Sequence, residues 1–148
     1  MDIFSKLLHL AAAIVWLGGM SFMLWALRPV AIAQLPPPLR IPLLAGVMAR
    51  FFAMVWGAIA LLLVTGVFTL GAVGMKAAPL GWHLMLGLGL LMIAIFGHLF
   101  FGPYRALRRA VVQADWPLAG RQLARMHPWV WTNCLLGWAA VAAVMLLR

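Results

Sequence analysis

The stretch FFAMVWGAIALLLVTGVFTLGAV, residues 51–73, contains neither a charged side chain nor a proline. A helix needs about 20 consecutive apolar residues to cross the hydrocarbon core of a bilayer. Three other stretches have the same character, and with their flanking turns the expected transmembrane helices span about residues 7–27, 48–73, 82–102 and 128–147. The sequence therefore predicts an all-α fold, an integral membrane four-helix transmembrane bundle.

Composition supports one membrane domain and leaves no room for a soluble one. Of the 148 residues, 67% are hydrophobic and 9% are charged, whereas charged residues make up roughly 25% of a typical soluble domain. We therefore expect residues 1–148 to form a single transmembrane domain. Lys6 precedes the first apolar run as in a signal peptide, but the run exceeds an h-region of about 7 to 15 residues, so a retained helix is expected.

Positive charges are concentrated between alternate helices. Eight arginines occupy or flank the first and third connections, namely Arg28, Arg40, Arg50, Arg105, Arg108, Arg109, Arg121 and Arg125. The opposite side carries only Lys6, Lys76 and Arg148. Because cytoplasmic loops are enriched in Lys and Arg, both termini are expected on the outer, periplasmic side of a bacterial-type inner (plasma) membrane. The net charge of +9 is attributed to this topology and to the lipid bilayer as partner, not to nucleic acid.

The connection 103–127 is the only extended hydrophilic segment. Its arginines alternate with four apolar residues at near-helical spacing, Leu107, Val111, Leu118 and Leu123. This pattern is typical of short amphipathic helices on a membrane surface. We therefore expect an amphipathic cytoplasmic loop here, with helix four opening at Pro128 because proline is well tolerated in a first helical turn.

Two further expectations concern helix two. Three consecutive prolines, Pro36 to Pro38, separate it from helix one, and Pro42 is expected in its first turn. The loop around residues 76–81 is short, so helices two and three are expected to be antiparallel neighbours.

Few side chains can carry chemistry inside these helices. Cys134 is the only cysteine, which excludes an internal disulfide and leaves packing as its expected role. The only acidic residues, Asp2 and Asp115, lie outside the apolar stretches. The sequence therefore lacks carboxylate pairs for acid–base catalysis and the intramembrane carboxylates that proton-coupled transporters usually use.

The four histidines are the main candidates for a functional site. His9 and His83 are expected near the outer face, and His98 and His127 near the inner face. His83 and His98 lie on one helix at levels about 22 Å apart. Since histidines from facing helices can supply both axial ligands of a b-type haem, the sequence predicts one or two haem b groups. The outer pair would bind the first and the inner pair the second.

Haem propionates require cationic partners near the interface. Arg28, Arg50 and Arg125 are available on the inner side, with Lys6 and Lys76 on the outer side, and Arg50 is included among the cofactor-binding candidates. The plainer alternative is that these cations snorkel or set topology. A single histidine at a helix end is likewise commonly a packing or interfacial residue.

Copper is the alternative cofactor, because thioether sulfur suits Cu(I) and imidazole suits copper generally. The chain has ten methionines. A copper site would combine His9 and His83 with Met20, Met23 and Met85. No Met-x-x-x-Met run repeats, so filling gaps in the core is the default role of the methionines.

Three motifs lie in the first two helices. They are Leu8-His9-Leu10 followed by Trp16-Leu17-Gly18-Gly19, then Arg50-Phe51-Phe52, and Val64-Thr65-Gly66. Together they resemble the copper-resistance D (CopD) family of integral membrane proteins. Trp82-His83-Leu84-Met85 is distantly similar to a motif of HemJ-type protoporphyrinogen oxidases. The resemblance implies a metal or haem role for His9 and His83, and either copper handling or haem-linked redox chemistry.

Three functional hypotheses follow. The leading one is a haem b-binding membrane protein for transmembrane electron transfer, with a haem-dependent oxidoreductase as the enzyme class considered and a redox partner or a homo-oligomer as candidate partners. The second is CopD-like copper transport or copper binding. The third is a non-catalytic membrane assembly subunit whose histidines only pack.

Overall fold

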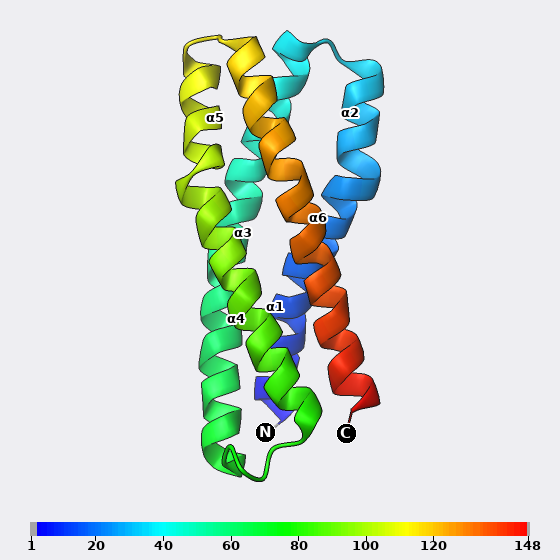
Figure 1. Ribbon diagram of the computed structural model, residues 1–148, viewed down its shortest axis with the longest axis vertical. Helices are drawn as coiled ribbons and strands as arrows, with labels where there is room; N and C mark the ends of the chain where they lie inside the picture. The colour runs from blue at the N-terminus through cyan, green and yellow to red at the C-terminus, as the bar shows by residue number, and fades with distance from the viewer. Residues whose placement is uncertain (1–2, 148) are drawn as a thin grey trace.

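The computed structural model describes residues 3–147, and its regular elements there are all helical (Figure 1). The elements are α1 Ile3–Phe22, the π-helical turn η1 Met23–Leu27, α2 Arg28–Gln34, α3 Pro37–Val73, α4 Leu80–Phe101, α5 Pro103–Val112 and α6 Trp116–Leu146. They form four rods that are long and apolar enough to cross a membrane, Ile3–Gln34, Pro37–Val73, Leu80–Val112 and Trp116–Leu146. The expected all-α, four-helix membrane architecture is confirmed.

The rods are longer than the sequence predicts. α3 alone has 37 residues, which at about 1.5 Å per residue gives about 55 Å, against about 30 Å for the hydrocarbon core. The first rod continues past residue 27 through η1 into α2. Pro29 follows η1, and its missing N–H and bulky ring disfavour a regular α-helical turn just before it, which explains the local widening.

Two prolines lie inside helices that were expected to begin with them. α3 opens at Pro37, and α6 opens at Trp116, so Pro42 and Pro128 are both internal. The early start of α6 is explained by Asp115, whose Oδ1 accepts a hydrogen bond from the Leu118 amide at 3.0 Å. This is an N-cap, and it satisfies one of the unpaired amides of the first turn.

The segment 103–127 is not a surface loop. It consists of α5 and the first turns of α6, and Figure 1 shows α5 standing along the long axis of the molecule beside α6. Leu107 and Ala110 of α5 and Ala119 of α6 are fully buried. The apolar face of α5 is therefore covered by protein, chiefly by α6.

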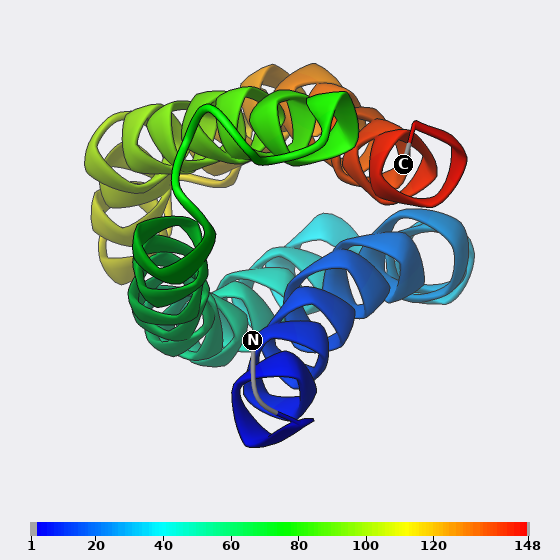
Figure 2. The same cartoon turned by 90° about the horizontal axis from the view of Figure 1, so that it is seen from below.

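The helices associate mainly as two pairs. α1 lies along α3, and α4 lies along α6, as the view from below shows (Figure 2). α3 and α4 are antiparallel and joined by a short loop, as expected, but the principal partner of α4 is α6. Aromatic rings join the two pairs where Phe52 of α3 meets Phe96 and Tyr104, with ring centroids 5.2 and 4.8 Å away.

Both described ends of the chain lie at one end of the bundle, next to the loop between α3 and α4 (Figure 1). The turn between α2 and α3 and the connection between α5 and α6 lie at the opposite end, where the arginines gather. Arg148, expected on the side of the termini, lies outside the described residues. Which end faces the cytoplasm remains a prediction from the distribution of charge.

Candidate functional site

The most specific polar contact between two helices joins His9 of α1 to Thr65 of α3. The His9 Nδ1 atom lies 2.7 Å from the Thr65 Oγ1 atom. His9 is partly buried and Thr65 is buried, so this contact lies in the wall between the first pair of helices. It links two residues 56 positions apart in the sequence.

The hydrogen-bond geometry defines the protonation pattern of the His9 ring. The Thr65 hydroxyl donates its single proton to the Leu61 carbonyl oxygen, 2.6 Å away, which is the usual back-bonding of threonine within a helix. With the hydroxyl proton on this carbonyl, the Thr65 oxygen accepts from His9, and Nδ1 is the nitrogen that carries the ring proton. The Nε2 atom is left with its lone pair, and this is the form in which a neutral imidazole ligates a metal ion.

His83 is placed differently from His9. It lies in the first turn of α4, where Nδ1 is 3.1 Å from the Pro79 carbonyl oxygen and Nε2 is 3.0 Å from the Met75 carbonyl oxygen. Both ring nitrogens thus face backbone acceptors of the loop between α3 and α4. In this arrangement His83 fastens the loop to the start of α4 and presents no free nitrogen to a ligand.

The inner histidines also have protein partners. The Nε2 atom of His127 accepts from the Trp131 indole, at 3.2 Å, and faces the Arg28 guanidinium, at 3.5 Å. Because tryptophan and arginine only donate, this nitrogen acts as an acceptor and is not available to iron. His98 is exposed, and its ring lies 5.3 Å from that of Trp129.

These contacts bring no two of the predicted ligands together. Each of the four histidines contacts a different partner. Within residues 3–147, no group of three or more His, Cys, Asp or Glu side chains could hold a metal ion. Haem b would require two histidines on opposite sides of one iron. The described contacts show no such arrangement, and haem is not supported. Arg50 is exposed on α3.

Met20, one of the methionines expected beside His9, lies at another level. Met20 is on the same rod as His9 and is buried, but eleven residues of helix separate them, about 16 Å. One ion cannot bind both. Met20 instead lies near the middle of the bundle, next to Ser21, whose Oγ is 3.6 Å from the Cys134 Sγ of α6.

Each of the four rods carries an arginine toward the end of the bundle opposite the described chain ends. Arg28 contacts His127, two residues from Arg125. The Phe52–Tyr104 contact places Arg50 and Arg105 at similar heights. Taken with the His98–Trp129 contact, these relations put the four arginines within about 9 Å of one another along the bundle axis, or less than two helical turns. We call Arg28, Arg50, Arg105 and Arg125 the arginine ring.

The residue that sequence reasoning missed is Thr65. It was noted only as part of the Val64-Thr65-Gly66 motif, with no role. The three motifs of the first two helices contact one another in the structure: His9 meets Thr65, and Phe51 lies directly against Gly19. Such pairing of short motifs is the signal that could have led from His9 to Thr65.

Comparison with known proteins agrees with the copper-related resemblance. The family model described as "Copper resistance protein D" matches residues 45–147, which covers most of α3 and all of α4, α5 and α6. α1 and its His9 lie outside the matched residues. No curated protein and no solved structure matches the chain, and the similarity to HemJ-type oxidases is not shown. On the extent of the family match and its four-helix membrane fold, the chain belongs to the copper resistance protein D family.

Proposed function

We propose that this membrane protein binds Cu(I) as a substrate within the bilayer and takes part in its transfer across it, with the His9 imidazole as one ligand. The observation that carries the proposal is the His9–Thr65 contact, which leaves the Nε2 lone pair unprotonated. Membership of a copper-resistance family supplies the metal. Imidazole and thioether are ligands that suit copper, and the reduced ion favours the softer of them.

The interior offers soft ligands deeper in the same bundle. Met20 is buried on α1, and Cys134 is fully buried on α6. Met92 of α4 reaches the same region, since its Cε lies 3.1 Å from where a Cβ on Gly137 would be, one turn from Cys134. Sulfur-bearing side chains from three helices therefore lie at similar levels, about 16 Å from His9 along the bundle axis. A Cu(I) ion would meet them after His9 rather than together with it.

Thr65 acts in this proposal as a positioning residue. A hydrogen bond to the second ring nitrogen fixes the tautomer and orientation of a ligating histidine, and its loss commonly costs 10- to 100-fold in metal affinity. Thr65→Val removes the acceptor with little change in shape, whereas Thr65→Ser keeps a hydroxyl. We expect Cu(I) affinity to fall about 10- to 100-fold in Thr65→Val and to be largely retained in Thr65→Ser.

The measurement is competition for Cu(I) between the purified full chain in detergent and a chromophoric Cu(I) chelator under reducing conditions. His9→Ala should lose the same binding event that Thr65→Val weakens, and His83→Ala should not, because both His83 nitrogens face backbone carbonyls. Unchanged affinity in both His9→Ala and Thr65→Val would remove His9 from the site. Absence of any Cu(I) binding by the unaltered chain would remove the function.

A visible spectrum separates this proposal from haem binding. The purified chain is expected to show no Soret band, and none should develop when haemin is added. A stoichiometric Soret band that disappears in His9→Ala would instead favour haem. If His9→Ala left both metal binding and cellular copper tolerance unchanged, the assembly-subunit hypothesis would gain support.

A further inference from the structure

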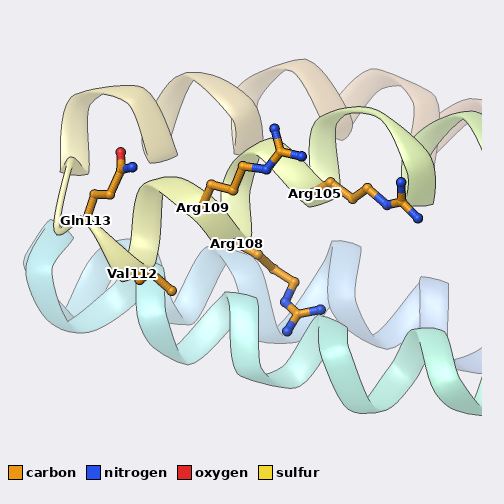
Figure 3. A pocket seen from close by; sticks show the side chains of 5 residues that line it. All are labelled: Arg105, Arg108, Arg109, Val112 and Gln113. Carbon is orange, nitrogen blue, oxygen red and sulfur yellow. The ribbon is translucent and has the colours of Figure 1, made fainter.

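A shallow pocket on α5 concentrates positive charge outside the His9 region. It is lined by Arg105, Arg108, Arg109, Val112 and Gln113 (Figure 3). The three arginines are exposed, while Leu107 and Ala110 of the same helix are buried against its neighbours. α5 therefore carries a basic face that none of its neighbours covers.

The described residues carry little negative charge to neutralise this face. In the range 3–147 the only carboxylate is Asp115, and its Oδ1 accepts the Leu118 amide as the N-cap of α6. No ion pair between an arginine and a carboxylate is formed within that range. Eight arginines thus share this end of the molecule with one carboxylate, and anions from outside the chain would reduce the repulsion among the arginines.

The arginine ring gives the pocket a depth relative to the bilayer. From the ring to the opposite ends of the four rods, the helices measure about 31 to 37 Å, which matches a hydrocarbon core of about 30 Å with modest tilt. Arg105 belongs to the ring, and Arg109 lies four residues or about 6 Å further out. That interval equals the thickness of one headgroup layer, about 5 to 7 Å.

Side-chain direction agrees with this depth. Figure 3 shows the Arg105 and Arg109 side chains extending along α5 toward α4, that is, back toward the apolar part of the bundle, while Arg108 extends sideways from the helix. Helical side chains lean toward the N-terminus of their helix, so this direction is built into α5. The Arg105 guanidinium lies 4.8 Å above the exposed ring of Phe101, where the apolar surface of α4 ends. A basic pocket thus borders an apolar surface.

We propose that the α5 pocket is a binding site for an anionic phospholipid carrying two phosphates. The phosphates would accept hydrogen bonds from Arg105, Arg108 and Arg109, since guanidinium groups match phosphate oxygens in geometry and charge. The acyl chains would lie over Phe101 and the lipid-facing side of α4. Charge, depth and the adjacent apolar surface favour a lipid over a soluble anion.

The test compares two arginine pairs with the same spacing and exposure. Arg105 and Arg109 lie on α5, and Arg121 and Arg125 lie on α6; the members of each pair are four residues apart, and all four side chains are exposed. Full-length protein in phosphatidylcholine nanodiscs is titrated with cardiolipin, and retained lipid is counted by native mass spectrometry. We expect the Arg105→Gln/Arg109→Gln variant to bind cardiolipin about 25-fold more weakly, because it removes two guanidinium groups that would contact the phosphates, each contributing about fivefold. The Arg121→Gln/Arg125→Gln variant should lose less than threefold.

Equal loss in the two variants would overturn the proposal, because it would show general attraction to the charged end. Tight binding of inorganic pyrophosphate, with displacement of cardiolipin at equal concentration, would overturn it in favour of a soluble anion. Gln113→Glu gives a second variant should the double mutant fold poorly, since it places one carboxylate in the pocket and should also weaken binding. These outcomes do not depend on whether the protein binds copper.

Discussion

Gly19 of α1 owes its importance to the side chain it lacks. A Cβ atom built on Gly19 would overlap the Phe51 ring of α3, whereas one built on the adjacent Gly18 would meet nothing within 4 Å. The sequence gives both glycines equal weight in the Gly18-Gly19 pair. Only the packing of α1 against α3 distinguishes them.

Gly19→Ala is therefore expected to destabilise the protein, and Gly18→Ala to leave it nearly unchanged. Overpacking of this kind costs about 1 to 3 kcal/mol, visible as a lower thermal midpoint in detergent. Phe51→Leu should recover part of the loss in a Gly19→Ala background, because the two residues are in direct contact. Equal effects of the two alanine substitutions would contradict this account.

His9 and Thr65 mark the limit of prediction at the residue scale. A histidine in an apolar helix is conspicuous, so His9 could be proposed from residue type alone. Its partner is 56 residues away, and nothing in a single sequence says which face of α3 meets α1. The pairs expected from depth, His9 with His83 and His98 with His127, stay predictions, since the described contacts join each histidine to a different partner. Rotation about each helix axis decides such contacts as much as height does.

At the scale of elements, apolar length predicted the four helices well and their ends poorly. Apolar runs report where lipid contacts a helix, but helices end where backbone hydrogen bonding fails. α5 and the first turns of α6 continue the bundle beyond the apolar stretches by burying Leu107, Ala110 and Ala119. The amphipathic spacing predicted helices in this segment, but not that they would pack along the bundle.

The start of α6 depends on Asp115. Asp115→Ala removes the acceptor of the Leu118 amide and should lower the free energy of unfolding by about 1 kcal/mol. The effect should be local, at the arginine-rich end of the bundle. Hydrogen exchange at the first turn of α6 would measure the fraying directly. Asp115→Asn is the control, because asparagine caps as well as aspartate. If Asp115→Asn frays the start of α6 as much as Asp115→Ala does, the negative charge of Asp115, and not its capping hydrogen bond, stabilises this end of the helix.

For the whole molecule, the described ends of the chain share one end of the bundle and the arginines the other. The positive-inside rule then predicts that both termini lie outside. Alkaline phosphatase fused after residue 148 should be active in cells, and a fluorescent protein inserted between α5 and α6 should fluoresce in the cytoplasm. Active phosphatase at the inserted position would show the reverse orientation.

The arginine ring also has a consequence for how the protein tolerates membranes of different thickness. If the protein moved by one helical turn toward the opposite leaflet, the guanidinium groups of the arginine ring would enter the hydrocarbon core. The ring therefore fixes the position of the hydrocarbon boundary at this end of the bundle. The opposite end carries few charges, Lys6 and Lys76 among the described residues. We therefore expect any mismatch between protein and bilayer to be absorbed at that end, by tilting or by local thinning of the adjacent leaflet.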